Sequence, residues 1–89
     1  MTLRAFLGEA SQKFRSQAHM LDHIERETGV RFSSGAMSMW LKGERYPDPR
    51  SRQVIKDAFK VSDRKWWGIM KADMMGETSD SSARKTAVA

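Results

Sequence analysis

The sequence predicts an all-α domain of five short helices, followed by a disordered tail. Apolar residues recur at three- and four-residue steps along most of the chain, and no stretch alternates long enough to predict a strand. Capping residues and glycines divide this pattern into short segments. The chain has 89 residues, enough for a single small domain with a thin core. We expect one helix bundle over residues 1–76 and a tail over residues 77–89.

The first two helices follow from an apolar stripe and from a cap and a stop. The stripe of the first helix lies on one helical face and consists of Leu3, Phe6, Leu7, Ala10 and Phe14. Ser16 is suited to cap a second helix. The residues of this helix that we expect to be buried are Ala18, Leu21 and Ile24. Gly29 is placed to end it in the left-handed conformation.

The remaining three helices are marked in the same way. Ser33 or Ser34 caps the third, which Gly43 ends; its inward residues are Met37, Trp40 and Leu41. The pair Asp48-Pro49 starts the fourth, whose predicted core residues are Val54, Ile55, Ala58 and Phe59. Ser62-Asp63 opens the fifth, which reaches Gly76 and carries Trp66, Trp67, Met70 and Met74. Val88 is the one large aliphatic residue after it, so the tail cannot offset its ordering entropy.

The composition excludes several classes of protein. The chain has no cysteine, so disulfides and thiolate metal sites are absent. Its first residues carry no sustained apolar run, and we expect neither a signal peptide nor a membrane span. These features favour a cytoplasmic protein. No glycine-rich phosphate loop or activated nucleophile is visible, so we expect no enzyme, no small-molecule substrate and no cofactor.

The positive charge is concentrated in the middle of the chain. Of the net charge of +5, all lies in residues 31–65, with nine basic against four acidic side chains, whereas the flanking segments are balanced. A local positive surface indicates a polyanionic partner. The third helix lies in this segment, and the second directly precedes it; both are short and are joined by a turn containing Gly29, as in a helix-turn-helix.

The third helix has the composition of a groove-reading element. One face is apolar, while the other is mostly small or polar, which allows close approach to base edges in the major groove. Basic residues follow it, where contacts to phosphate would hold it in register.

The segment from Ser38 to Pro47, Ser-Met-Trp-Leu-Lys-Gly-Glu-Arg-Tyr-Pro, resembles the lambda-repressor-like (Cro/repressor) helix-turn-helix family. The run from Ile55 to Ser62 resembles the family's fourth helix, and the likeness covers roughly residues 14 to 70. It implies a five-helix bundle that binds double-stranded DNA as a homodimer on a two-fold operator and usually represses transcription. Such a protein is expected to be nucleoid-associated.

The resemblance assigns roles to individual residues. With the analysis of the third helix, it gives a base-facing set of Ser34, Gly35, Ser38 and Met39, joined by Arg31 from the preceding turn. The phosphate-facing set is Ser33, Lys42, Arg45, Tyr46, Arg50 and Arg52. The turn is about two residues longer than in the family, with Arg31-Phe32 as the apparent insertion, and Glu25 stands where the family has a small residue.

Two further features have a structural and a functional interpretation. His19 and His23 have metal-ligand spacing but lack a third ligand in the sequence, so we expect an exposed helix face and no metal. The fifth helix is apolar nearly all round, as a buried closing helix or a dimer interface would be. The predicted interface residues are Trp66, Trp67, Ile69, Met70 and Met74.

Three classes of function remain. The sequence favours a transcriptional repressor of a phage or plasmid type. A DNA-binding antitoxin or accessory factor that also engages a protein is the first alternative. A protein-interaction module without DNA binding is the second, and it predicts no affinity for duplex DNA at physiological salt. We identify no ligand-sensing domain in the sequence.

Overall fold

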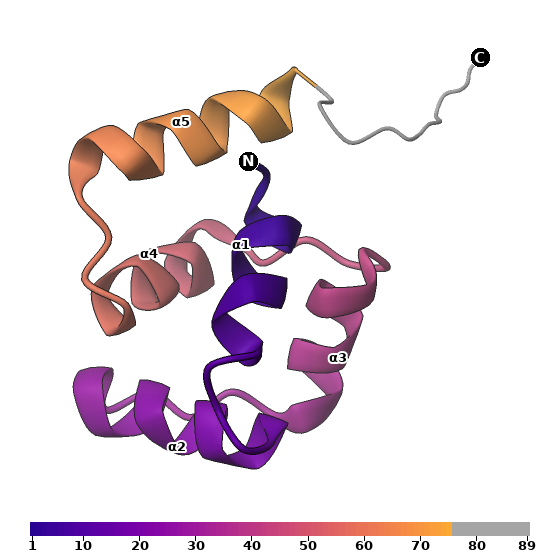
Figure 1. The fold of residues 1–89 in the computed structure, drawn as a ribbon, viewed down its shortest axis with the longest axis vertical. Helices are drawn as coiled ribbons and strands as arrows, with labels where there is room; N and C mark the ends of the chain where they lie inside the picture. The colour runs from indigo at the N-terminus through magenta and orange to yellow at the C-terminus, as the bar shows by residue number, and fades with distance from the viewer. Residues whose placement is uncertain (76–89) are drawn as a thin grey trace.

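The computed structural model describes residues 1–75 and shows five α-helices joined by short connections (Figure 1). The helices are α1 (Leu3–Ser11), α2 (Gln17–Thr28), α3 (Ser34–Lys42), α4 (Pro49–Ala58) and α5 (Asp63–Met74). No strand occurs within residues 1–75, so the all-helical prediction is confirmed. The tail predicted over residues 77–89, and Gly76 as a helix stop, lie outside the described residues.

Each of these helices begins with a side-chain cap. An oxygen of the capping residue accepts the backbone N–H three positions ahead, and the caps are Thr2, Ser16, Ser33, Asp48 and Ser62. A cap of this kind stabilises a helix by about 1 kcal/mol. The sequence predicts four of them; for the third helix, Ser33 rather than Ser34 is the cap. Thr2 is the cap that sequence analysis missed.

Two glycines end helices as predicted. Gly29 (φ 78°) follows α2 and Gly43 (φ 77°) follows α3, both in the left-handed region that other residues enter only at a cost. A β-carbon on Gly29 would meet no atom within 4 Å, whereas one on Gly43 would lie 2.9 Å from Arg4 Nη1. A side chain at Gly43 would therefore have to displace the Arg4 guanidinium in addition to adopting the left-handed backbone.

The core draws on every helix. α1 runs through the middle of the bundle and packs on α3 and α5, while α2 packs mainly on α4 (Figure 1). The largest fully buried side chains, each less than 2% exposed, are Leu3, Leu7, Met20, Ile24, Met37, Ile55 and Ile69. Because these come from all five helices, the described residues form one core.

Some burial predictions are wrong in detail. Ala18 is exposed and Met20 is buried in its place, because the buried stripe of α2 centres on Met20, Leu21 and Ile24. Helix α1 ends at Ser11, so Phe14 lies in the following turn, where it still packs against the core.

The inward faces of the later helices are narrower than predicted. Leu41, Val54 and Phe59 are only half-buried at the edge of the core. In α5 the buried residues are Ile69 and Ala72. None of the helices within residues 1–75 has both the length and the hydropathy to cross a lipid bilayer.

Candidate nucleic-acid interface

Helix α3 lies at the edge of the bundle and presents one face to solvent (Figure 1). The outward residues are Ser34, Gly35, Ser38, Met39 and Lys42, of which only Ser38 is half-buried. Their spacing places them on one side of the helix, since each residue advances by about 100°. All the predicted base-facing residues of α3 therefore share one face, and most of that face is small or polar.

The inner face of α3 is anchored firmly. Met37 is fully buried and Trp40 is 9% exposed. The ring of Phe32 meets the ring of Trp40 edge-on, with centroids 4.9 Å apart. Phe32, in the longer turn, thus packs against the core and fixes the entry of the chain into α3.

One residue that sequence analysis missed joins α2 to the outward face of α3. Gln17 Nε2 donates to the carbonyl oxygen of Ser34 at 3.0 Å and to Ser38 Oγ at 3.2 Å. Gln17 is the first residue of α2, so the start of α2 lies beside the outward face of α3. The only signal in the sequence was its position after the capping Ser16.

Arg31 lies apart from the base-facing set. Its Nη1 donates to Asp22 Oδ1 in a short contact and to Glu25 Oε1 at 3.3 Å, both on α2. The hydrogen bond and charge of Arg31 lower the pKa of Asp22. In this arrangement Arg31 closes the longer turn against α2, and it would have to leave both carboxylates to reach a base.

The predicted phosphate-facing residues fall into two groups. Lys42, Arg45 and Arg50 are exposed, and no hydrogen bond or ion pair within residues 1–75 engages their side chains. They belong to the end of α3, the connection to α4 and the start of α4. These side chains can meet an anion without breaking an internal contact. Ser33 is exposed, although its hydroxyl oxygen caps α3.

Tyr46 and Arg52 instead make contacts with other residues of their own chain. Tyr46 Oη donates to Asp73 Oδ2 on α5 at 2.6 Å. Arg52 Nη1 donates to the Pro47 carbonyl oxygen at 2.7 Å, and its guanidinium lies 5.1 Å from the centre of the Tyr46 ring. Burial, followed by the bond to Asp73, raises the pKa of Tyr46. These two residues brace the connection between α3 and α4.

A second missed residue extends the basic surface. Arg4, exposed on α1, donates from Nε to the carbonyl oxygen of Leu41 at 3.2 Å. A cation at this place is favourable, because the last carbonyls of a helix carry partial negative charge. Arg4 therefore adds positive charge near Lys42.

The start of α4 is already occupied by a carboxylate. Asp48 Oδ1 accepts the Ser51 N–H at 2.8 Å, and this bond lowers the pKa of Asp48. A phosphate at this helix start would therefore have to compete with the carboxylate of Asp48. Lys56 is likewise paired, with Asp63 at 2.9 Å.

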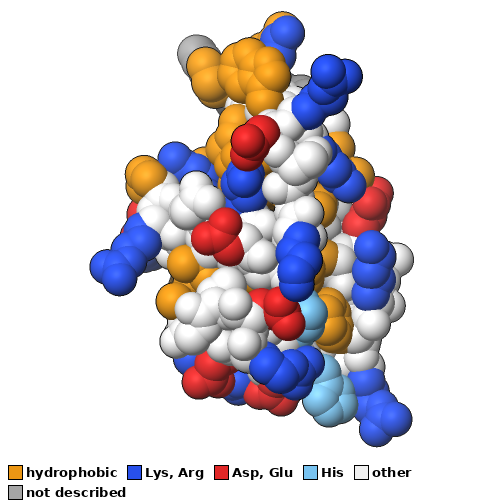
Figure 2. Space-filling model, turned by 90° about the vertical axis from the view of Figure 1, so that its left-hand side faces the viewer, with side chains coloured by type: hydrophobic (Ala, Val, Ile, Leu, Met, Phe, Trp, Pro, Cys, Tyr) orange, Lys and Arg blue, Asp and Glu red, His pale blue; other side chains and the backbone are white. Residues whose placement is uncertain are grey.

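The predicted dimer residues of α5 are divided between core and surface. Ile69 is 2% exposed and packs within its own chain, so it cannot contact a second subunit. Trp66 and Met70 are half-buried, whereas Trp67 and Met74 are 61% and 81% exposed. Figure 2 shows hydrophobic side chains gathered at the upper end of the molecule, where α5 lies.

The two histidines are not a matched pair on an exposed face. His19 is exposed, but His23 is half-buried, and its Nε2 lies 3.3 Å from the carbonyl oxygen of Ala58. Within residues 1–75 no three potential metal-ligating side chains are grouped.

Comparison of the chain with family models, with curated proteins and with solved structures gave no match.

Proposed function

We propose that this protein is a sequence-specific, double-stranded-DNA-binding transcriptional regulator, with α2 and α3 as a lambda-repressor-like helix-turn-helix. The observation that carries the proposal is the outward face of α3. Small side chains allow the helix backbone to approach base edges, and cations with no internal partner lie at its end.

The arrangement divides the work between two groups of residues. Ser34, Gly35, Ser38 and Met39 would face the bases, and the exposed Lys42, Arg45 and Arg50 would contact phosphates. Tyr46 and Arg52 would act indirectly, by holding the connection between α3 and α4 in place.

Base readout by this set is chemically weak. None of the outward residues of α3 is Arg, Asn or Gln, the side chains that make bidentate contacts with guanine or adenine. Serine hydroxyls discriminate poorly, and Met39 can only pack on a thymine methyl group. We infer that DNA shape and the spacing of two half-sites supply much of the specificity.

This reliance on spacing implies a homodimer on a two-fold operator. The exposed apolar residues of α5, Trp67 and Met74 above all, are the surface we assign to the second subunit. Repression is the regulatory effect proposed, since a bound dimer needs no further domain to block a promoter.

The first experiment is binding to the duplex upstream of the protein's own gene, against a scrambled duplex, at low and physiological salt. We expect preferential binding that survives added salt. Equal binding to both duplexes that disappears at physiological salt would mean that the protein contacts only phosphates and has an accessory role. Absence of binding to either duplex would overturn the proposal and favour a protein-interaction module.

A pair of variants at one position tests the role of α3. A β-carbon on Gly35 would meet no atom within 4 Å, so both Gly35→Ala and Gly35→Glu should fold. We expect Gly35→Ala to keep its affinity for the specific duplex and Gly35→Glu to lose roughly tenfold or more, a cost of at least 1.4 kcal/mol. Gln12→Glu, at the exposed end of α1, controls for the added charge.

A further inference from the structure

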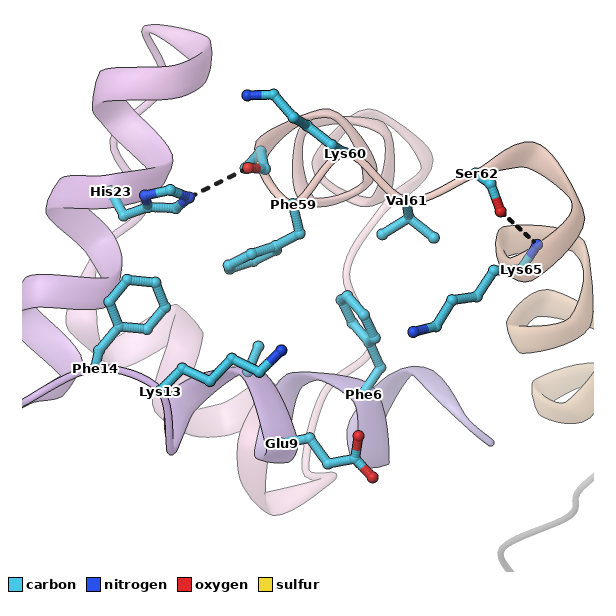
Figure 3. Close-up of a pocket in the computed structure, with 12 residues that line it drawn as sticks. Phe6, Glu9, Lys13, Phe14, His23, Phe59, Lys60, Val61, Ser62 and Lys65 are labelled. Atoms are coloured by element: carbon cyan, nitrogen blue, oxygen red, sulfur yellow. Dashed lines mark hydrogen bonds between the residues drawn. The ribbon is translucent and has the colours of Figure 1, made fainter.

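A groove that the proposed DNA-binding surface does not use lies between α1, α2 and the connection from α4 to α5 (Figure 3). Its volume is about 630 Å³, within the range of roughly 300–1,000 Å³ that is typical of small-molecule sites. None of its lining residues comes from α3. The groove can therefore be occupied without covering the outward face of that helix.

The floor of the groove is aromatic. The ring of Phe59 lies at its centre, 5.9 Å from Phe6, 6.3 Å from Phe14 and 5.6 Å from His23. Phe14, His23 and Phe59 are each half-buried, so their rings are partly open to solvent. Such rings offer faces and edges to another flat ring.

His23 holds this floor in place. It stacks on Phe59 with an angle of 26° between the rings, and Nε2 donates to the carbonyl oxygen of Ala58 at 3.3 Å. Phe14 lies 5.2 Å from the imidazole and 6.3 Å from Phe59, so the three rings contact one another. The aromatic surface is thus formed before any ligand arrives, which reduces the ordering cost of binding.

Two ammonium groups stand over the floor. Lys65 Nζ is 5.5 Å from the centre of the Phe6 ring, and in Figure 3 the side chains of Lys13 and Lys65 extend toward that ring from opposite sides. Of the other charged lining residues, Lys60 pairs with Glu27 at 2.9 Å. Figure 3 shows the Glu9 carboxylate turned away from Phe59. The charge that faces the groove is therefore positive.

These features define the ligand by its chemistry. A flat ring would cover the open aromatic surface, and a carboxylate would pair with both ammonium groups. An inorganic anion would leave the rings uncovered, while a neutral ring would leave the cations unpaired. We propose that this groove binds a small aryl carboxylate, with its ring on Phe14 and Phe59 and its carboxylate between Lys13 and Lys65.

The test is titration of the full chain with phenylacetate, followed by amide ¹H–¹⁵N spectra. We expect saturable shifts confined to the amides of the groove, in residues 6–14, 23 and 58–65. The neutral analogue phenylacetamide and the ringless anion acetate should each bind at least roughly tenfold more weakly, because each lacks one of the two interactions.

Variants assign the binding to the groove. Lys13 and Lys65 are exposed, so the double variant Lys13→Gln/Lys65→Gln should fold normally. We expect it to lose at least roughly tenfold in affinity, the loss given by one charge-assisted hydrogen bond. Lys71→Gln, exposed on α5 outside the groove, should bind like the unmodified protein.

Several results would overturn the proposal. These are shifts that do not saturate at millimolar phenylacetate, equal binding of phenylacetamide, and an equal loss in Lys71→Gln. If an acidic peptide ending in phenylalanine binds and phenylacetate does not, the groove is a site for a protein partner and the small-ligand proposal is wrong. No DNA is present in these titrations, so their outcome is independent of the DNA-binding proposal.

Discussion

The hydroxyl of Tyr46 donates to the carboxylate of Asp73 at 2.6 Å, and the same carboxylate accepts the backbone N–H of Leu3 at 3.1 and 3.3 Å. One side chain of α5 thus ties together the start of α1 and the connection between α3 and α4. Arg52 lies against the Tyr46 ring and donates to Pro47 in the same connection. A small polar cluster therefore joins the proposed dimer helix, α5, to the connection that follows the proposed DNA-binding helix, α3.

Removing this carboxylate should destabilise the fold more than removing the hydroxyl. Asp73→Ala loses the bonds to both Tyr46 and Leu3, and we expect a cost of about 1–3 kcal/mol in the free energy of unfolding. Tyr46→Phe loses only one bond at a half-exposed site, with a cost of about 1 kcal/mol or less. Urea unfolding measures both. Equal stability of Asp73→Ala and the unmodified protein would show that the cluster does not support the fold.

The ionisation of Tyr46 provides a second check. Burial and the bond to Asp73 raise its pKa above the ordinary value of about 10. The stability that accompanies this shift is fully present below pH 10 and is lost as the pH rises through the pKa of the folded state. Tyr46 is the only tyrosine, so phenolate absorbance near 295 nm reports it alone. We expect a titration above pH 10 in the folded protein and near 10 in urea, and identical curves would contradict the bond.

The end of α3 should be less tolerant than the end of α2. Gly29→Ala and Gly43→Ala both place a β-carbon on a left-handed residue, which costs about 1–2 kcal/mol. Gly43→Ala must also displace Arg4 from the Leu41 carbonyl, so we expect a larger loss of stability there. In the Arg4→Ala background the two substitutions should cost the same free energy of unfolding, measured by thermal or urea unfolding. A difference that persists without Arg4 would assign it to another cause.

Loss of the exposed apolar residues of α5 should weaken self-association. Trp67 and Met74 contribute little to the core of their own chain, so Trp67→Ser/Met74→Ser should fold normally. We expect dimerisation, measured by sedimentation equilibrium, to weaken by roughly tenfold or more, given about 1.5–3 kcal/mol for each large apolar side chain buried. Met39→Ser, an exposed methionine on α3, is the control. A monomeric unmodified protein would contradict the dimer.

The sequence predicts the helices well because their ends are local events. A hydroxyl or carboxylate before a helix and a glycine after it act within three or four residues, so Ser16, Asp48 and Gly43 can be identified without tertiary information. Burial was less predictable. A small alanine and a flexible methionine fit either face of α2, and only the packing of α2 in the bundle selects Met20 over Ala18.

The parts of the candidate site that sequence analysis missed are all contacts between distant residues. Gln17 reaches Ser38, Arg4 reaches Leu41 and Tyr46 reaches Asp73. No local pattern marks these pairs, because each depends on how two helices are placed relative to each other. Sequence reasoning assigned Tyr46 to phosphate for this reason, since the partner of its hydroxyl lies on another helix.

The bridge from Gln17 to Ser34 and Ser38 constrains how this surface can change. Ser38 is both an outward residue of α3 and the acceptor that fixes the start of α2. A substitution there that removes the side-chain oxygen also removes one of the two bonds from Gln17, whereas Met39 has no such bond. New specificity would therefore arise most readily at Met39, while a change at Ser38 would either keep an acceptor for Gln17 or be accompanied by a change of Gln17.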